Sequence, residues 1–208
     1  MNTDDRIFSR FERAIENRNV SHAYILEGSY TVDKIAYAKK MAKMLLCSNG
    51  GCGECIVCKK IDRNEYEDLH ITEPEGTSIK DSDIETIQNR LKVKPFVGDR
   101  NIVIVSRADT MTRWAQNRLL KTLEEPPEGA VIILLADNIE SFLQTVVSRC
   151  VVFRLESLSI NETDSDPFEY AKKLEALIYE EEPFYRILDY VKKFSKDKDE
   201  ILTRRRLR

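Results

Sequence analysis

Three short apolar runs constrain the fold of this chain most strongly: 23–26, 102–105 and 131–135. Each is rich in aliphatic residues without a polar alternation, a pattern typical of strands that are buried on both faces of a sheet. Between the runs lie stretches with apolar residues at helical spacing, among them 35–45 and 115–123. Strands that alternate with helices predict βαβ units and an α/β fold with a parallel, doubly wound sheet.

The composition suits one medium-sized domain with an appendage. The chain has 208 residues, of which 42% are hydrophobic and 33% are charged. The strand and helix pattern ends near Glu156, and residues 161–167 are polar. The residues that follow are rich in Lys and Glu and predict helices. We therefore predict a core domain over 1–156 and a helical segment over 157–208.

The charge and hydropathy exclude several classes of protein. The net charge of −3 gives no general basic surface of the kind that binds duplex nucleic acid. No apolar run approaches the length of a membrane span, and the first residues lack the core of a signal peptide. We expect a cytoplasmic protein that makes no contact with a membrane.

Four cysteines crowd into one glycine-rich stretch. Cys47, Cys52, Cys55 and Cys58 have the spacing C-x4-C-x2-C-x2-C. Four thiolates satisfy a tetrahedral zinc ion and leave no open position, so such a site is structural. An iron–sulfur cluster, a redox-active C-x-x-C pair and free thiols are the alternatives. We favour a zinc module over 47–58.

The stretch after the first apolar run has the placement of a phosphate-binding loop, but an altered sequence. Gly28 and Lys34 occupy the positions of the first glycine and the lysine in G-x-x-x-x-G-K-[S/T]. Asp33 replaces the second glycine, and Ile35 replaces the hydroxyl that would hold magnesium. A carboxylate repels phosphate and an aliphatic side chain binds no metal, so we expect no functional site for ATP or magnesium.

The end of the second apolar run supports the same interpretation. In ATPases of this type an acidic pair follows that strand and holds magnesium. Ser106 and Arg107 stand there instead, and Asp109 lies farther along, where we interpret it as a helix-flanking or loop carboxylate. Both halves of a hydrolytic site therefore depart from the functional pattern.

Ser148-Arg149-Cys150 precedes a further short apolar run, 151–153. An arginine there is either an ordinary surface charge or a guanidinium presented to the phosphates of a neighbouring subunit. Cys150 is interpreted as a core residue and not as a fifth metal ligand.

Several segments together resemble the bacterial clamp-loader subunits of the AAA+ family. Over about residues 5–155, the similar segments are the four-cysteine module, Ser21–Tyr24, Lys94–Gly98, Asn117–Pro127 and Ser148–Cys150. The resemblance implies a three-layer AAA+ sheet with helices on both faces. The altered residues at 33, 35, 106 and 107 favour the delta-prime type over the tau/gamma type, which keeps an intact phosphate loop.

The resemblance also implies a function and partners. The chain would be a non-hydrolysing subunit that assembles with tau/gamma and delta subunits to load the sliding clamp onto primed DNA. Arg149, with Ser148 beside it, would act as an arginine finger in trans. The chain itself would not be an enzyme, although its complex belongs to the DNA polymerase III holoenzyme. Residues 157–208 would form a helical lid and the start of a collar, and we expect both to be incomplete.

Two other functions stay open on the residues. The first is an active ATPase subunit of tau/gamma type, which the altered phosphate loop disfavours. The second is a zinc-dependent nucleic-acid-binding module. Such a module would need aromatic residues interleaved with basic ones, and there is no aromatic residue between Cys47 and Cys58.

Overall fold

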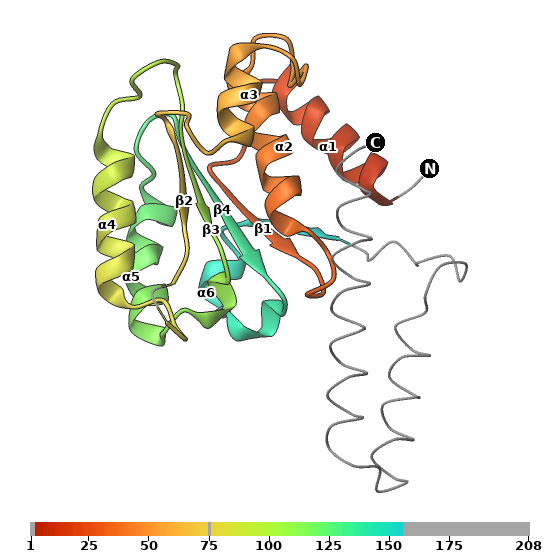
Figure 1. Cartoon of the computed structure of the whole chain (residues 1–208). Coiled ribbons are helices and arrows are strands. Elements are labelled where there is room, and N and C mark those ends of the chain that lie inside the picture. Colours follow the sequence, from red (N-terminus) through yellow and green to blue (C-terminus); the bar gives the residue numbers. More distant parts are fainter. Residues whose placement is uncertain (1–2, 75, 156–208) are drawn as a thin grey trace, which may run out of the picture. The chain divides into compact units, whose positions relative to one another are not determined.

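The computed structural model describes residues 3–74 and 76–155 (Figure 1). Its five strands are β1 (Ala23–Glu27), β2 (Leu69–Thr72), β3 (Asn101–Val105), β4 (Ala130–Ala136) and β5 (Val151–Arg154). Its α-helices are α1 (Thr3–Glu16), α2 (Lys34–Leu46), α3 (Ile56–Asp62), α4 (Asp81–Lys92), α5 (Arg113–Glu124) and α6 (Gln144–Val147). Two 3₁₀ turns, η1 (Ala108–Thr110) and η2 (Ile139–Ser141), follow β3 and β4.

The five strands form one parallel sheet in the order β2-β3-β4-β1-β5. β1 lies between β4 and β5, with Tyr24 opposite both Ile133 and Val151. Because all strands run in one direction, the loops that follow β1, β3 and β4 meet at one edge of the sheet. The predicted parallel sheet is confirmed, and its topology places the phosphate loop beside the end of β4.

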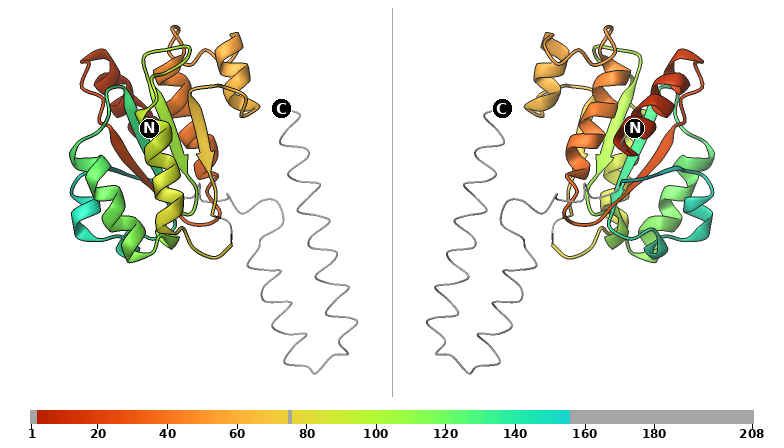
Figure 2. Two further views of the ribbon diagram at one scale, coloured as in Figure 1. Left: turned by 90° about the vertical axis from the view of Figure 1, so that its left-hand side faces the viewer. Right: turned by 90° about the vertical axis from the view of Figure 1, so that its right-hand side faces the viewer.

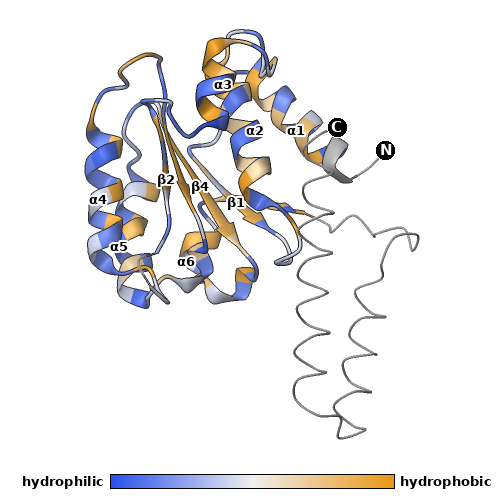
Figure 3. Cartoon of the chain, viewed as in Figure 1, coloured by the Kyte–Doolittle hydropathy of each residue, from blue (hydrophilic) through white to orange (hydrophobic). Residues whose placement is uncertain are grey.

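Helices cover both faces of the sheet, as the three-layer prediction requires (Figure 1). The alternation along β1 shows why: Tyr24 and Leu26 pack with α1, α2 and α3, whereas Ala23 and Ile25 pack with α4, α5 and α6. All five residues of β3 and all seven of β4 are buried. Figure 3 shows the apolar strands between helices whose outer surfaces are polar. The continuous apolar runs in the sequence follow from this burial on both faces.

The predicted zinc module begins at the end of α2. In the side views of Figure 2, the short helix α3 stands beside the end of α2. Three of the four cysteines lie from the end of α2 to the start of α3, and Cys58 lies in α3. No helix in the described part of the chain is both long and apolar enough to span a membrane. The predicted helical segment 157–208 lies outside the described residues and stays a prediction.

Candidate metal centre and phosphate loop

The four cysteines reach one point from three kinds of local structure. Cys47 ends α2, Cys52 lies in the glycine-rich loop, Cys55 is the N-cap of α3, and Cys58 lies in the first turn of α3. The loop needs glycine at Gly51, whose φ is +88° and where a Cβ atom would lie 3.3 Å from the backbone nitrogen of Met44. A left-handed backbone and a close approach to α2 thus bring the loop back toward Cys47.

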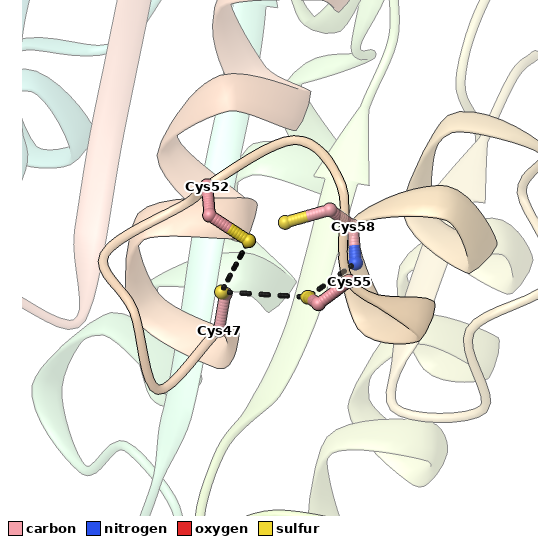
Figure 4. Close-up of side chains that lie close together, drawn as sticks. All are labelled: Cys47, Cys52, Cys55 and Cys58. Atoms are coloured by element: carbon pink, nitrogen blue, oxygen red, sulfur yellow. Dashed lines mark hydrogen bonds between the residues drawn. The ribbon is translucent and has the colours of Figure 1, made fainter.

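The sulfur atoms converge as Figure 4 shows. All four Sγ atoms lie within 4.8 Å of one another, and Cys47 Sγ is 3.8 Å from Cys52 Sγ and 3.6 Å from Cys55 Sγ. Four thiolates placed about 2.3 Å from a tetrahedral zinc ion would be separated by about 3.8 Å. None of the five cysteines is in a disulfide. The donor set and its geometry therefore fit a zinc ion, and the four cysteines could hold one.

The thiols differ in acidity. Burial opposes ionisation of Cys47, but hydrogen bonds from the backbone of Cys52, Asn49 and Gly51 lower its pKa to about 6. Burial raises the pKa of Cys58 to about 12, and the neighbouring sulfurs act in the same direction. At neutral pH Cys47 is ready to bind a metal, whereas Cys58 must release a proton. Metal affinity should therefore fall as the pH falls.

The phosphate loop is closed by its own lysine. Lys34 Nζ donates to the carbonyl oxygens of Gly28 and Ser29, at 2.8 and 2.9 Å, and pairs with the Asp137 carboxylate at 2.7 Å. The Lys34 side chain is only 12% exposed. An ammonium group has three donors, and all three have partners within the chain. The lysine that would hold phosphate in an ATPase is thus engaged with the loop itself and with the end of β4.

Asp33 acts as the N-cap of α2. Its carboxylate accepts a hydrogen bond of 3.0 Å from the backbone N–H of Ala36. The free N–H groups at the start of this helix are the groups that bind phosphate in a functional loop. Asp33 therefore adds a negative charge and also occupies one of the donors. Ile35 is partly buried and packs against the core on the α1–α3 face of the sheet.

Gly28 packs closely against Leu155. A Cβ atom there would lie 3.1 Å from both the Cβ and the carbonyl oxygen of Leu155, which is closer than most contacts allow. The glycine that resembles the first residue of a phosphate loop thus has a structural reason to be present.

The segment after β3 carries no acidic pair. Ser106 donates its backbone N–H to Thr72, and Arg107 has a left-handed backbone and donates to the carbonyl of Gly76 at 3.0 Å. Asp109 accepts a 3.1 Å hydrogen bond from the backbone N–H of Asp137. Asp109 lies in the 3₁₀ turn η1, and it also holds the residue that pairs with Lys34.

Arg149 lies between α6 and β5 and is held by two partners. One Nη atom donates to the carbonyl of Thr145 at 2.9 Å, and the other pairs with Glu124 at 2.8 Å. Its side chain is 36% exposed. Ser148 Oγ donates to the same carbonyl at 3.1 Å. Burial raises the pKa of Cys150 to about 12, in keeping with its interpretation as a core residue.

Sequence reasoning missed two residues of these sites. Asp137 closes the phosphate loop through Lys34, and Glu124 holds Arg149. Asp137 directly follows a buried strand, so its position at the carboxyl edge of the sheet was a usable signal. No local signal assigns Glu124, because its contact depends on the packing of α5 against α6.

Residues 3–159 match the model of the family described as DNA polymerase III, delta subunit. The chain belongs to this family. It is 34% identical over 156 residues to the DNA polymerase III subunit delta' of Bacillus subtilis, and 31% identical over 158 residues to the tau/gamma subunit of Haemophilus influenzae. Each match covers 74% of this chain, but only 47% and 23% of those proteins. The chain thus spans about half the length, or less, of these curated relatives.

A solved structure, that of a gamma subunit-related protein of Thermotoga maritima, is 26% identical with a TM-score of 0.48. The match covers 88% of this chain and 57% of that one. The resemblance to delta-prime subunits is confirmed by the family match and the Bacillus subtilis relative. The predicted α/β fold, a parallel sheet with helices on both faces, is confirmed as well.

Proposed function

We propose that this chain is the delta-prime type of clamp-loader subunit, a component that hydrolyses no ATP itself. In this role it assembles with tau/gamma and delta subunits, and the assembly loads the sliding clamp onto primed DNA. The observation that carries the proposal is the closed phosphate loop, in which Lys34 pairs with Asp137, in a chain of the clamp-loader family. The role assigns the chain to the cytoplasm, where a reducing environment leaves thiols available for metal.

The loss of hydrolysis follows from three features of the loop. Lys34 is engaged, Asp33 caps the helix that would bind phosphate, and Ile35 offers no oxygen to magnesium. Opening the loop for ATP would break the Lys34–Asp137 pair and bring phosphate beside the Asp33 carboxylate. Ser106 and Arg107 also leave no acidic pair after β3 to hold magnesium or to orient water.

Arg149 is proposed to act on ATP bound by an adjacent tau/gamma subunit. The contacts with Thr145 and Glu124 engage two of the five N–H donors of its guanidinium. Arginine suits the task because it is always charged and offers a planar fork of donors to phosphate oxygens. The two contacts, one at each Nη atom, would orient the guanidinium before the neighbouring subunit arrives, and three N–H donors would remain for phosphate oxygens.

The four cysteines are proposed to bind one structural zinc ion. Zinc would fix the loop between α2 and α3, which has glycines at three positions with positive φ and few groups of its own to pack. A four-sulfur site has no open position, so the ion would stabilise the loop and would supply no chemistry.

The test is assembly and clamp loading with purified tau/gamma, delta, sliding clamp and this chain from one organism. We expect the chain to co-purify with tau/gamma and delta, and clamp loading to depend on its presence. The isolated chain should show no ATP turnover. A chain that binds neither subunit, or whose omission leaves clamp loading unchanged, would contradict the proposed role.

The active tau/gamma-type ATPase is the second candidate, and one observation favours it. Lys34, Asp109 and Asp137 lie at the same edge of the sheet, where an ATPase would place its charged groups. The same purified chain decides between the candidates, because an active subunit would turn over ATP and would lose that turnover in Lys34→Ala.

A further inference from the structure

A buried amide on α5 contacts the segment that precedes Arg149. Gln116 is only 2% exposed. Its side-chain nitrogen donates to the carbonyl oxygens of Met111 and Ser141, at 3.2 and 3.0 Å. Its side-chain oxygen accepts a hydrogen bond of 2.7 Å from the backbone N–H of Leu143. Two acceptors for the nitrogen and one donor for the oxygen satisfy the amide, so its burial is compensated.

The contact with Leu143 lies at the start of α6. This helix has only four residues, and a helix this short depends on tertiary contacts for its position. Leu143 is its N-cap, and its aliphatic side chain cannot cap the helix. Gln116 bonds the backbone N–H of the N-cap residue, as a glutamate within the helix does in a capping box. The amide therefore supplies from α5 a polar contact that α6 does not supply itself.

The Met111 side of the contact is fixed independently of α6. Met111 forms a β-bridge with Ile79, and the neighbours Thr110 and Thr112 exchange backbone hydrogen bonds with Ile79 at 3.2 and 3.0 Å. A displacement of α6 would therefore stretch its bonds to Gln116, because the amide is also held on its other side.

The end of α6 carries Arg149. The backbone N–H of Arg149 donates to the carbonyl of Val146 at 3.1 Å, and one Nη atom donates to the carbonyl of Thr145 at 2.9 Å. The other Nη atom pairs with Glu124, which lies about two turns along α5 from Gln116. Helix α5 thus holds this segment at both ends, through Gln116 at its start and through Glu124 at Arg149.

We propose that Gln116 is a positioning residue for Arg149. By fixing the start of α6, it sets the direction in which the guanidinium points toward ATP on the adjacent subunit. The inference rests on the proposed function, because it takes from it the action of Arg149 on a neighbour's ATP. An amide with a structural role alone would stabilise the chain and would leave that reaction unchanged.

The experiment compares Gln116→Met with the matched control Gln88→Met. Gln88 is also buried, at 9% exposed, and its amide donates to Arg118 and Thr122 on α5, at 3.0 and 2.8 Å. It therefore joins α4 to α5, whereas Gln116 joins α6 to α5. Methionine is close to glutamine in length and has no N–H donor. Gln116→Asn keeps the amide on a shorter side chain and is the milder variant.

Each variant is measured alone and in the complex with tau/gamma and delta, in the presence of sliding clamp and primed DNA. Gln116→Met and Gln88→Met should both lower the melting temperature of the chain, since each leaves buried polar groups without a partner. Both should still co-purify with tau/gamma and delta.

Only Gln116→Met should lower the ATPase rate of the complex at saturating ATP. We expect a fall of about threefold, smaller than that of Arg149→Ala, because displacement of a catalytic group costs rate even when the group is present. The KM for ATP should stay nearly unchanged, because the guanidinium acts on charge that develops during the transfer. Gln116→Asn should show the same pattern with a smaller fall.

Two combinations test whether Gln116 acts through α6 and Arg149. Gln116→Met should lower the rate no further when it is combined with Arg149→Ala. Leu143 has φ −62° and ψ 139°, and Phe142 before it is extended, so proline fits at position 143. Leu143→Pro removes the N–H that Gln116→Met leaves without a partner and restricts the backbone where α6 begins. It should restore part of the rate that Gln116→Met loses.

The results separate the inference from the proposed function. If Gln116→Met assembles and hydrolyses ATP at the wild-type rate while Arg149→Ala does not, the inference is wrong and the proposed function stands; Gln116→Asn decides this if Gln116→Met does not fold. An equal fall in Gln88→Met, or a further fall in the combination with Arg149→Ala, also overturns the inference. If Arg149→Ala hydrolyses ATP as the wild type does, the action of Arg149 in trans falls and the inference falls with it.

Discussion

Two glycine-containing loops at opposite ends of α2 use their polar groups in opposite ways. In the loop from Cys47 to Cys58 the four sulfurs lie within 4.8 Å of one another and aim at a common point. In the loop from Gly28 to Ile35, Lys34 turns inward to its own loop and to Asp137, and Asp33 caps the helix. In the first loop the four sulfur atoms could all bind one metal ion. In the second loop the Lys34 ammonium group and one N–H group at the start of α2 are already bonded within the chain.

The difference separates residues that converge on a common point from residues that serve the loop itself. A Cβ atom at Gly28 would lie 3.1 Å from Leu155, and Lys34 joins the loop after β1 to the residue that follows β4. Residues that resemble a binding motif can thus persist for structural reasons. A complete donor set that converges is a stronger indication of a ligand than a partial motif is.

The largest effect is expected for the cysteine loop. Cys55→Ser should lower the zinc content from one equivalent to well below one, because structural zinc sites of this type bind with an apparent free energy of about 10–16 kcal/mol at pH 7. The α/β core should stay folded, since its strands lie outside the loop. Metal analysis measures the zinc content, and circular dichroism measures whether the α/β core stays folded. Cys150→Ser is the control and should keep its zinc, and a wild-type protein without zinc before any chelation would contradict the prediction.

The second effect tests whether the chain acts on the ATP of a neighbour in place of its own. Arg149→Ala should lower the ATPase and clamp-loading rates of the reconstituted complex. An arginine finger contributes about 10³–10⁵ in rate in other systems, and one of several sites in a ring should show less. Arg149→Lys should restore little of the ATPase and clamp-loading rates, because lysine keeps the charge but lacks the planar fork of donors.

Glu124 sharpens the same test. Glu124→Gln should lower the rate by a smaller factor than Arg149→Ala, because it removes only the partner that holds the guanidinium. Glu124→Gln should not lower the rate further when it is combined with Arg149→Ala. Glu125→Gln, at the neighbouring exposed position, is the control. Wild-type clamp loading by Arg149→Ala would show that Arg149 is a structural or surface residue.

A smaller effect is expected for the phosphate loop. Lys34→Ala should reduce the free energy of unfolding by about 1–2 kcal/mol, because a largely buried ammonium group loses a charged partner and two carbonyl acceptors. It should leave the ATPase rate of the isolated chain at background. Denaturant unfolding measures the change in the free energy of unfolding, and Lys59→Ala, at an exposed position, is the control. If the wild-type chain binds ATP and Lys34→Ala does not, the interpretation of the loop as closed to ATP is wrong.

The smallest effect lies outside both loops and gives a baseline for pH experiments. Burial, and then the charge of Arg90, lower the pKa of His70 below its ordinary value. The unfolded chain therefore binds a proton more readily than the folded one. Stability from the neutral imidazole is complete above about pH 6.5 and is lost as the pH falls through the unfolded and then the folded pKa. His70→Gln should flatten this part of the stability profile, and an unchanged profile would contradict the assignment.

The sequence predicted the features that depend on local pattern. The buried runs that became β1, β3 and β4 and the four clustered cysteines needed no knowledge of the fold. The position of Asp137 at the carboxyl edge of the sheet could be predicted, but its pairing with Lys34 could not, because that pairing depends on strand order. The pairing of Arg149 with Glu124 could not be predicted either, because it depends on helix packing. Asp33 was predicted to repel phosphate, but its second role as a helix cap needed the backbone geometry.

The central claim is that one loop binds its ligand and the other does not, and one titration tests it directly. Mg–ATP is titrated calorimetrically into zinc-analysed, chelator-free protein, and ATP turnover is measured on the same sample. The account predicts one zinc per chain, no Mg–ATP binding in the micromolar range and no turnover. Micromolar binding with turnover that Lys34→Ala abolishes would contradict it, and would make this chain an active ATPase subunit.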